Sequence, residues 1–518
     1  MLRRIHAFFN RPRTLILAIL ATYAIFPIQT LSFQHDALLY LNTIVAFLGN
    51  PDTPLTHPHH MLTMAFYVGI AKGIHALWPD MSLPAVALAA MRYGNIACTG
   101  LALLGFQWVS ERTLGVKPMA QCWMLVGMGF SFLIWSYASS AELYQPSLAC
   151  FAWVLFFLFL PSTPWRVGMM VLLTVGMLSL HLMSIGLVLA VLFALRHTPR
   201  RLVSYSLGSG FGVLGVYGLP LLQLKTWDAV VGWLMPAGGP LGFSLLHSFL
   251  HIPIGLGRSF FGLAFVFANT DVYQWVSRVL LGRLYLIDDV FLVQGTSHAQ
   301  WWASFLMWGA AVVAMGAVVW VAAKSLRRVS KNEKVRTLLL CLGGSFSVVV
   351  LSRDSHNEDL YVYIVCVFFV LLGVLFDKVK QPLLFWSAVV LMGVSNYSGA
   401  IRYLQDPTRD LFRQTAMAVA ALPADGRPVV LDLQRNYAPY LTFYGISRHV
   451  LYLSDVDSLR SVGQDVWVSH ASLVSTAYMQ QRYPETSANL QQLAAWGLGD
   501  RIPKTPFVTP RLIKGVTP

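Results

Sequence analysis

The chain has 518 residues, of which 56% are hydrophobic and only 12% are charged, and its mean hydropathy is +0.59. A soluble protein carries about 25% charged residues, and a chain of this length needs that polar cover to hide its core. The composition therefore excludes a soluble globular protein, and with it disordered, collagenous, coiled-coil and disulfide-scaffold chains. Repeated apolar stretches of about 20 residues predict a polytopic α-helical membrane protein instead.

The net charge of +14 would suggest a nucleic-acid partner in a soluble protein. Here the basic residues gather in short hydrophilic breaks, such as 3–13, 196–201 and 324–336. That pattern orients helices in a bilayer, so we expect no nucleic-acid partner. The five cysteines lie in apolar segments without a CxxC or Cys/His spacing, which is typical of small buried side chains.

The first apolar stretch, 14–31, follows a basic arm and lacks a small-residue cleavage site, so we expect a retained signal-anchor helix. With the basic arm in the cytoplasm, the loop 34–60 is extracytoplasmic. Further apolar spans are expected at 61–78, 84–109, 120–137, 143–160, 167–195, 202–222, 301–323, 335–351, 360–376 and 382–396. The 167–195 stretch is long enough for two short helices, which gives about 11 to 13 helices in all.

The charged breaks constrain which spans cross the membrane. If every span crossed once, the loops 111–117 and 139–145 would both contradict the positive-inside rule. The conflict disappears if 61–78, which carries Lys72 and His75, lies along the interface or re-enters. The breaks then divide between two sides. The cytoplasmic breaks are 112–117, 166, 196–201, 324–336 and 378–380, and the extracytoplasmic segments are 139–145, 225–300, 352–359 and the C-terminal tail.

The composition changes near residue 400, where charged and turn-forming residues return. We therefore divide the chain into a membrane domain, 1–400, and a soluble C-terminal α/β domain, 401–518, on the extracytoplasmic side. Within the second domain we expect short strands at 428–433, 449–453 and 465–469, and helices at 406–421 and 488–496.

Polar residues of several chemical types gather in the first external loop, 34–60. They are one carboxylate next to the first helix, an aromatic residue and a group of histidines: His35, Asp36, Tyr40, His57, His59 and His60. A carboxylate in this place can simply cap a following helix. Together, however, these side chains supply a base, hydrogen-bond donors to an anion and possible metal ligands at one membrane surface.

Three segments in chain order resemble the GT-C superfamily of polyprenyl-phosphate-sugar-dependent glycosyltransferases, which includes protein O-mannosyltransferases and aminoarabinose transferases. The first is the loop with Asp36 after a helix, an aromatic a few residues on, and a His-Pro pair before the next helix. The second, 139–144, is similar to an Ala-Glu-x-Tyr element of a bacterial branch, and the third, 180–182, is similar to a helix-pair element there. The resemblance covers roughly the first 200 residues, and the layout of many helices before an external domain agrees with it.

The resemblance implies roles for single residues. Asp36 would be the general base of an inverting reaction, and Glu142 would orient the acceptor or share a cation with Asp36. For Glu142 the alternative is that it only complements the dipole of the following helix. Candidates for holding the phosphate near the membrane surface are His57, His59, His60, Arg258, Arg283 and Arg353.

Arg353 has the best placement among these, at the outer end of a helix and before Tyr361 and Tyr363, although a solvated loop with internal ion pairs is the alternative. The remaining residues expected to bind substrate are His35, Tyr40, Tyr144, His181 and Tyr361. A lone histidine in an apolar stretch, as His181 is, can also be a satisfied packing residue.

No cofactor is expected to be required. Asp36, His57, His59 and Glu142 could form a divalent metal site, but the superfamily often has a second acidic residue beside the first, and here Ala37 follows Asp36. That departure argues against a site built on two adjacent carboxylates.

The resemblance implies a membrane transferase. The short basic loops, with no retention or transit signal, favour a bacterial inner membrane, and the orientation places the active site on its periplasmic face. The partners of the transferase would be membrane lipids, a polyprenyl-phosphate-linked sugar and an extracytoplasmic glycan, lipid or protein acceptor, with the C-terminal domain as a lid or acceptor-docking module. Alternatives are a transporter or flippase of lipid-linked saccharides, a surface-polysaccharide polymerase or ligase, and a non-catalytic subunit with the same fold.

Overall fold

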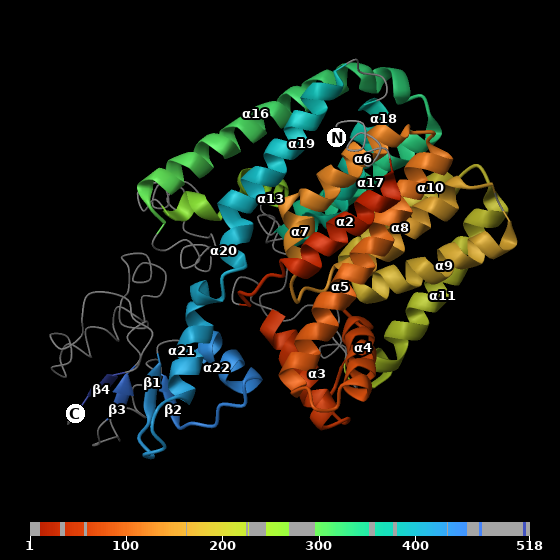
Figure 1. The fold of residues 1–518 in the computed structure, drawn as a ribbon. Helices are drawn as coiled ribbons and strands as arrows, with labels where there is room; N and C mark the ends of the chain where they lie inside the picture. The colour runs from red at the N-terminus through yellow and green to blue at the C-terminus, as the bar shows by residue number, and fades with distance from the viewer. Residues whose placement is uncertain are drawn as a thin grey trace.

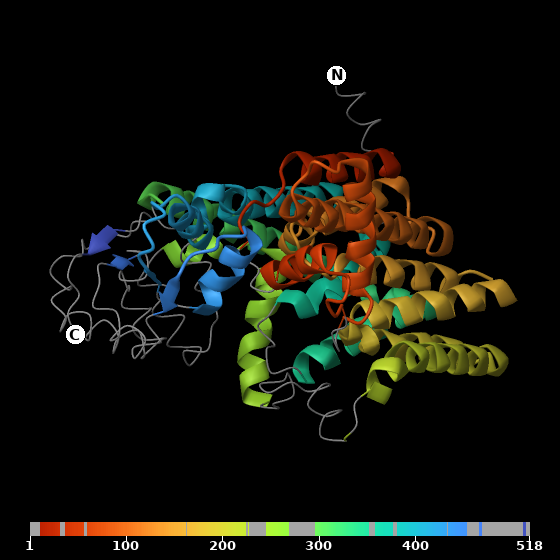
Figure 2. The same ribbon diagram turned by 90° about the horizontal axis from the view of Figure 1, so that it is seen from below.

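The structure is a computed structural model that describes residues 11–31, 37–55, 60–161, 163–223, 226, 245–268, 296–351, 358–376, 381–431, 434–452, 466–468 and 511–513. A bundle of apolar helices makes up most of it, and a small α/β unit lies beside one end of the bundle (Figure 1). Seen from below, the α/β unit projects to one side of the helices (Figure 2).

The helices of the bundle follow the apolar stretches of the sequence. They are α2 (Pro12–Ile25), α3 (Ala37–Gly49), α4 (Thr63–Leu77), α5 (Leu83–Trp108), α6 (Pro118–Phe130), α7 (Phe132–Ala138), α8 (Gln145–Phe159), α9 (Pro164–Leu180), α10 (Ile185–Leu195), α11 (Pro199–Gln223), α13 (Leu245–Phe260), α16 (His298–Val329), α17 (Glu333–Leu351), α18 (Val362–Phe376) and α19 (Pro382–Asn396). Proline occupies the first turn of α2, α5, α6, α8, α9 and α19, where its missing N–H costs no hydrogen bond.

Within the described residues, five helices are long and apolar enough to cross a membrane, or six if the bent pair α6 and α7 counts as one. Shorter apolar helices, α2, α8, α9 and α10 among them, pack beside these. The chain is therefore a polytopic helical membrane protein, as the composition predicts.

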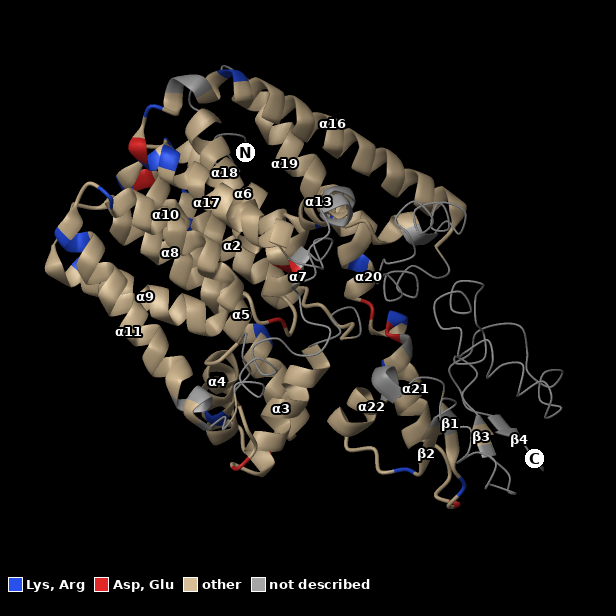
Figure 3. Ribbon diagram, turned by 180° about the vertical axis from the view of Figure 1, so that it is seen from behind, with Lys and Arg blue, Asp and Glu red and all other residues tan. Residues whose placement is uncertain are grey.

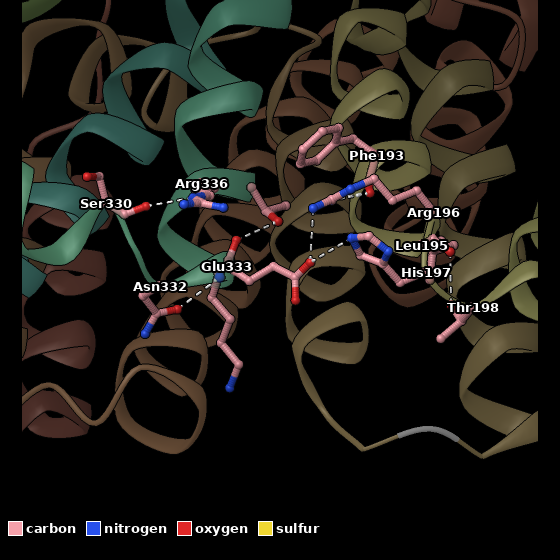
Figure 4. A network of polar contacts seen from close by, with 11 residues as sticks. Phe193, Leu195, Arg196, His197, Thr198, Ser330, Asn332, Glu333 and Arg336 are labelled. Atoms are coloured by element: carbon pink, nitrogen blue, oxygen red, sulfur yellow. Dashed lines mark hydrogen bonds and ion pairs between the residues drawn. The ribbon is translucent and has the colours of Figure 1, made fainter.

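One end of the bundle, which we call the basic end, brings together three of the charged breaks. Glu333 lies 3.3 Å from the Arg196 guanidinium and 4.0 Å from the His197 ring (Figure 4). Lys334 donates to the carbonyl of Thr113 over 2.7 Å. The breaks after α5, after α10 and before α17 therefore share one end, as the positive-inside pattern predicts.

The opposite end, which we call the loop end, gathers the loops predicted to be extracytoplasmic. Ile28 donates its N–H to the carbonyl of Ser139 over 3.1 Å, and Leu62 donates to Ser179 over 3.0 Å. In Figure 3 the coloured charged residues lie mostly towards the two ends and on the α/β unit, and the helices between are largely uncharged.

The first external loop contains α3, and α4 follows it directly; both helices lie beside the start of α5 (Figure 1). α4 has 15 residues and is about 22 Å long, shorter than the roughly 30 Å of a bilayer's hydrocarbon core. It begins beside Leu180 at the loop end, where Thr63 donates to the Leu180 carbonyl, and α5 then runs from the loop end to the basic end. Both ends of α4 thus lie at the loop end, which agrees with the prediction that 61–78 does not cross.

Two apolar stretches are broken rather than continuous. The stretch 120–137, predicted to be one span, bends by 66° between α6 and α7. Asn396, which is fully buried, donates to the carbonyl of Phe130 at that break and to that of Phe260, and accepts from the N–H of Gly262. Its amide satisfies backbone groups that a break inside the bundle would otherwise leave unpaired.

The second break divides 167–195 into α9 and α10, as the length of that stretch predicts. His181 has an extended backbone there, and a single 3-10 turn, Leu182–Ser184, leads into α10. The break places the imidazole of His181 at the loop end of both helices.

The C-terminal unit begins where the last membrane helix ends. α19 continues through a π-helical turn, Tyr397–Ile401, into α20 (Arg402–Leu404), and α21 (Leu411–Ala420) and α22 (Gln434–Phe443) follow. The strands β1 (Val429–Leu431), β2 (Val450–Tyr452), β3 (Val466–Val468) and β4 (Arg511–Ile513) form a sheet of order β2-β1-β3-β4. β1 pairs in parallel with β2 and β3, and β4 is antiparallel to β3.

The three predicted strands are therefore confirmed, and β4 was not predicted. The predicted helix 406–421 is shorter, because a 3-10 turn, Pro407–Arg409, precedes α21, which Asp410 caps. The helix predicted at 488–496 lies outside the described residues.

A separate apolar core joins the first external loop to the C-terminal unit. Side chains of α3, α4 and the first half of α5 share it with Ala141, Leu143 and residues of α21, α22 and β1. The first external loop is therefore packed from two sides, by the membrane domain and by the C-terminal unit.

Candidate functional site

Four aromatic rings from segments far apart in the sequence meet at the loop end: Tyr40, His60, Tyr144 and His181. The imidazoles of His60 and His181 stack almost in parallel, with ring centroids 5.3 Å apart and planes at 9°. Tyr144 stands perpendicular to His181 at 4.7 Å, and Tyr40 meets His60 edge-on at 6.2 Å. All four side chains are buried, so the rings form one compact group, which we call the ring cluster.

A chain of hydrogen bonds orients His181. Ser147 donates its hydroxyl to the carbonyl of Met177, so its oxygen accepts from the Tyr363 hydroxyl 2.7 Å away. Tyr363 has then used its only proton, and its oxygen accepts from Nδ1–H of His181 over 3.2 Å. Nδ1 therefore carries the proton, and Nε2 is an acceptor in the neutral ring and a donor once protonated.

A hydrogen bond to the last residue of α9 orients His60 and, as in His181, fixes which ring nitrogen carries the proton. Nδ1 of His60 lies 3.1 Å from the carbonyl of Leu180, which can only accept, so Nδ1 again carries the proton. Thr63 donates to the same carbonyl over 2.7 Å. Carbonyls in the last turn of a helix have no partner within that helix, and here His60 and Thr63 supply one.

The loop with Glu142 is held by two polar side chains from α4 and α5. Asn95 donates to the carbonyls of Ser140 and Glu142 over 2.9 and 2.7 Å, and Tyr67 donates to the Glu142 carbonyl over 3.2 Å. The Tyr67 hydroxyl also bonds to the Asn95 amide oxygen. Burial, with smaller contributions from Cys98 and the Glu142 carboxylate, raises the pKa of Tyr67 well above its usual value, so it stays a neutral donor.

Glu142 is itself buried but does not belong to the next helix. α8 begins at Gln145, and its first turn contains no acidic residue. Glu142 thus lies three residues before the helix, in the loop that Asn95 and Tyr67 hold.

Tyr144 connects the ring cluster to the segment that precedes α18. Its hydroxyl donates to Oδ2 of Asp359 over 2.8 Å, and its ring stacks on Tyr137 at 5.3 Å. Tyr361 points elsewhere: its hydroxyl donates to the carbonyl of Ile252 in α13 over 3.2 Å. Tyr361 was the predicted residue of this segment, but it is Tyr363, two residues later, whose hydroxyl contacts the ring cluster through His181.

Several buried polar atoms on these same segments have no hydrogen-bond partner. They are both amide atoms of Gln145 and the hydroxyls of Ser140 and Ser179. Gln145 directly follows Tyr144, and Ser179 lies next to Leu180. Unpaired buried polar groups are rare and costly, and a ligand that bonds to them would remove that cost.

No protein-family profile matches the sequence, and no curated protein matches it. Among solved structures, the chain is similar to ArnT from Cupriavidus metallidurans bound to undecaprenyl phosphate, with a TM-score of 0.52, 10% identity, and coverage of 88% of this chain and 91% of that one. The chain therefore shares its overall fold with that protein. The archaeal oligosaccharyltransferase AglB from Archaeoglobus fulgidus, in complex with an inhibitory peptide and a dolichol-phosphate, also matches, with a TM-score of 0.47, 10% identity, and coverage of 94% and 72%.

The fold of the chain brings together some of the predicted site residues. Tyr40, His60, Tyr144 and His181 lie in the ring cluster, and Glu142 lies in the loop beside it. His181 therefore has more specific surroundings than a lone packing histidine would.

Other predicted residues fall elsewhere. His35, Asp36, His57, His59, Arg283 and Arg353 lie outside the described residues. Arg258 is buried in the last turn of α13, a helix that packs against the segment of Tyr361. In the part of the chain that the structure describes, no three His, Cys, Asp or Glu side chains are grouped to hold a metal ion.

Sequence reasoning missed the residues that hold the site together, namely Tyr67, Asn95, Gln145, Ser147 and Asp359. Asn95 carried a usable signal, because an amide in the middle of an apolar span is costly unless it has a structural or functional partner. Ser147 carried none, since serine is common near the start of any helix.

Proposed function

We propose that this protein is an inverting glycosyltransferase that moves a sugar from a polyprenyl-phosphate donor to an acceptor hydroxyl on the extracytoplasmic side of a membrane. The observation that carries the proposal is the ring cluster, which unites His60, Tyr144 and His181 at one end of a GT-C fold.

The chemistry needs two sets of groups on opposite sides of the anomeric carbon. A general base takes the proton of the acceptor hydroxyl, and donors or cations stabilise the phosphate as it leaves. Asp36 is the proposed base. An ionised carboxylate is basic at neutral pH without a large pKa shift, so its contribution depends mainly on its position.

The two stacked histidines suit the phosphate side. Two protonated imidazoles 5.3 Å apart would repel by about 3 kcal/mol at an effective dielectric constant of about 20, so without a phosphate we expect the pair to carry at most one positive charge. A phosphate dianion at the edge of the stacked pair would favour protonation, because an Nε2–H that points at it becomes a charge-assisted donor. Developing negative charge on the leaving phosphate would be stabilised in this way.

A lipid-linked donor also accounts for the architecture. The isoprenoid tail remains in the bilayer while its sugar phosphate reaches the water boundary, so the site belongs at the ends of membrane helices. The ring cluster satisfies that condition, since His181 lies at a helix break and Tyr363 is the second residue of α18. A transporter of lipid-linked saccharides would more typically place ionisable groups at the bilayer midplane.

The direct test is the Asp36→Asn variant of the full chain, assayed with purified protein and radiolabelled sugars linked to undecaprenyl phosphate. Membranes from cells that lack the protein supply the acceptor, and the transfer of label out of the donor lipid is measured. We expect a loss of about 10²- to 10⁴-fold in rate with a normally folded protein.

Asp52→Asn is the matched control, because Asp52 is an exposed carboxylate of the same loop, just after α3. It should transfer sugar at the wild-type rate. Unchanged transfer by Asp36→Asn would refute Asp36 as the base. The absence of transfer by the wild-type protein from any donor sugar in the panel would refute the function itself.

A further inference from the structure

The segment that leads from α2 towards Asp36 is fixed to the connector between the membrane domain and the C-terminal unit. Gln29 and Thr30 both donate their N–H groups to the carbonyl of Leu404, over 2.9 and 3.0 Å. Gln405 donates its side-chain amide to the carbonyl of Phe26 over 2.9 Å. These bonds join residues more than 370 positions apart in the sequence.

The last of these contacts ends on a buried carboxylate. Leu31, the final described residue before Asp36, donates its N–H to Oδ2 of Asp410 over 2.9 Å. The same oxygen accepts from the Tyr440 hydroxyl over 2.7 Å, and Oδ1 accepts from the N–H of Arg413 over 3.0 Å. Asp410, which is fully buried, therefore joins the first external loop, the start of α21 and α22.

The chain on the other side of Asp36 is held by the same unit. Ala37 begins α3 and is buried, and Asn42 in α3 donates to the carbonyl of Pro439 in α22 over 2.9 Å. α3 and α22 share one apolar core. The residues on both flanks of Asp36 are thus fixed by α21 and α22.

We propose that Asp410 is a positioning residue for Asp36, and that through it the C-terminal unit sets the rate of sugar transfer. This inference rests on the proposed function. A general base must lie within hydrogen-bond reach of the proton that it takes, and a displacement of about 1 Å can cost about 10²-fold in rate. The C-terminal unit then acts on the chemical step itself, beyond any part in docking the acceptor.

Asp410→Asn separates this role from simple stabilisation of α21. Asparagine caps helices as well as aspartate does, so its oxygen can still accept from Arg413. An amide has one acceptor oxygen, so only one of the two backbone bonds, from Leu31 or from Arg413, can be kept, and two donors cannot bond to each other. With the oxygen towards Arg413 the contact to Leu31 is lost, and hydrogen exchange of the Arg413 amide reports whether this orientation is adopted.

The test compares Asp410→Asn with Asp406→Asn in full-length protein reconstituted in lipid nanodiscs. Asp406 is exposed and caps the neighbouring 3-10 turn through Thr408, so it matches the substitution without touching the first external loop. Three quantities are measured: hydrogen exchange of the amides in 26–41, the rate of sugar transfer, and the Kd for undecaprenyl phosphate alone.

For Asp410→Asn we expect at least tenfold faster exchange in 26–41 and a kcat lower by about 10- to 100-fold. The Kd for undecaprenyl phosphate and the KM for the donor should stay within about twofold, a pattern that general loss of folding would not give. Asp406→Asn should match wild type in all three measurements.

Unchanged exchange in Asp410→Asn would overturn the inference, and so would faster exchange with an unchanged kcat. If the wild-type protein transfers no sugar, the proposed function fails, and the exchange measurement alone still decides whether Asp410 fixes the segment before Asp36. A Kd that rises as much as kcat falls would show a disturbed donor site and would also overturn the inference.

Discussion

At the scale of single residues, the site is organised largely by backbone carbonyls that accept from polar side chains. The Leu180 carbonyl accepts from Thr63 and lies within bonding distance of Nδ1 of His60, and the Glu142 carbonyl accepts from Asn95 and Tyr67. Carbonyls released by a helix break are costly at membrane depth unless they are satisfied. The helix breaks therefore need polar side chains that bond to their carbonyls, and one of these hydrogen bonds orients the ring of His60.

The hydroxyl of Tyr363 offers a test of this arrangement, because Tyr363→Phe removes only the atom that links His181 to Ser147. We expect about a tenfold lower rate of sugar transfer, since His181 loses the acceptor that fixes its Nδ1 proton, and a loss of about 1 kcal/mol in stability. Initial rates and thermal unfolding measure the two effects.

Tyr205→Phe is the matched control, because it removes a buried hydroxyl that pairs with Thr174 between α9 and α11. It should lose similar stability with an unchanged rate. Equal rates for the two variants would show that Tyr363 only packs.

At the scale of secondary-structure elements, α10 and α17 approach through a pair of glycines. A side chain at Gly186 would overlap the carbonyl oxygen of Gly344, and one at Gly344 would overlap that of Gly186. α10 begins at the break that carries His181, so this close approach also holds the break in place.

Gly344→Ala should therefore force α10 and α17 apart and lower stability by about 1 to 3 kcal/mol, measured as the midpoint of thermal unfolding in detergent. Gly343→Ala is the control on the same helix, because its added methyl group meets no atom within 4 Å. It should be neutral or slightly stabilising, since alanine is the better helix former. A Gly344→Ala protein as stable as Gly343→Ala would contradict the packing described.

The elements also show how far sequence reasoning reaches. Hydropathy located the apolar stretches, and alternation located three strands, because these signals are local. The 66° bend between α6 and α7 was missed, since that stretch is apolar on every side and its cause, Asn396, bonds to a carbonyl 266 positions away. Similarly, the choice between Tyr361 and Tyr363 depends on a 3-10 turn, Glu358–Tyr361, which sets the phase of α18.

At the scale of the whole molecule, the division into a membrane domain and a soluble domain follows the change in composition, but the packing of side chains crosses that division. The first external loop belongs structurally to both, because its helix α3 shares one core with α21, α22 and β1. This shared core could not be predicted from the sequence, since contacts such as Leu31 to Asp410 join residues 379 positions apart. The structure does bring together Tyr40, His60, Tyr144 and His181, four residues that were named as substrate-binding candidates.

The proposed function requires a lipid-linked phosphate to bind at the ring cluster. An experimental structure of the protein with bound undecaprenyl phosphate tests this most directly. We predict the phosphate within hydrogen-bond distance of His60 or His181, with the isoprenoid chain leading into the bilayer between the helices. A phosphate bound at the basic end beside Arg196 and Lys334, or away from both histidines, would contradict the account.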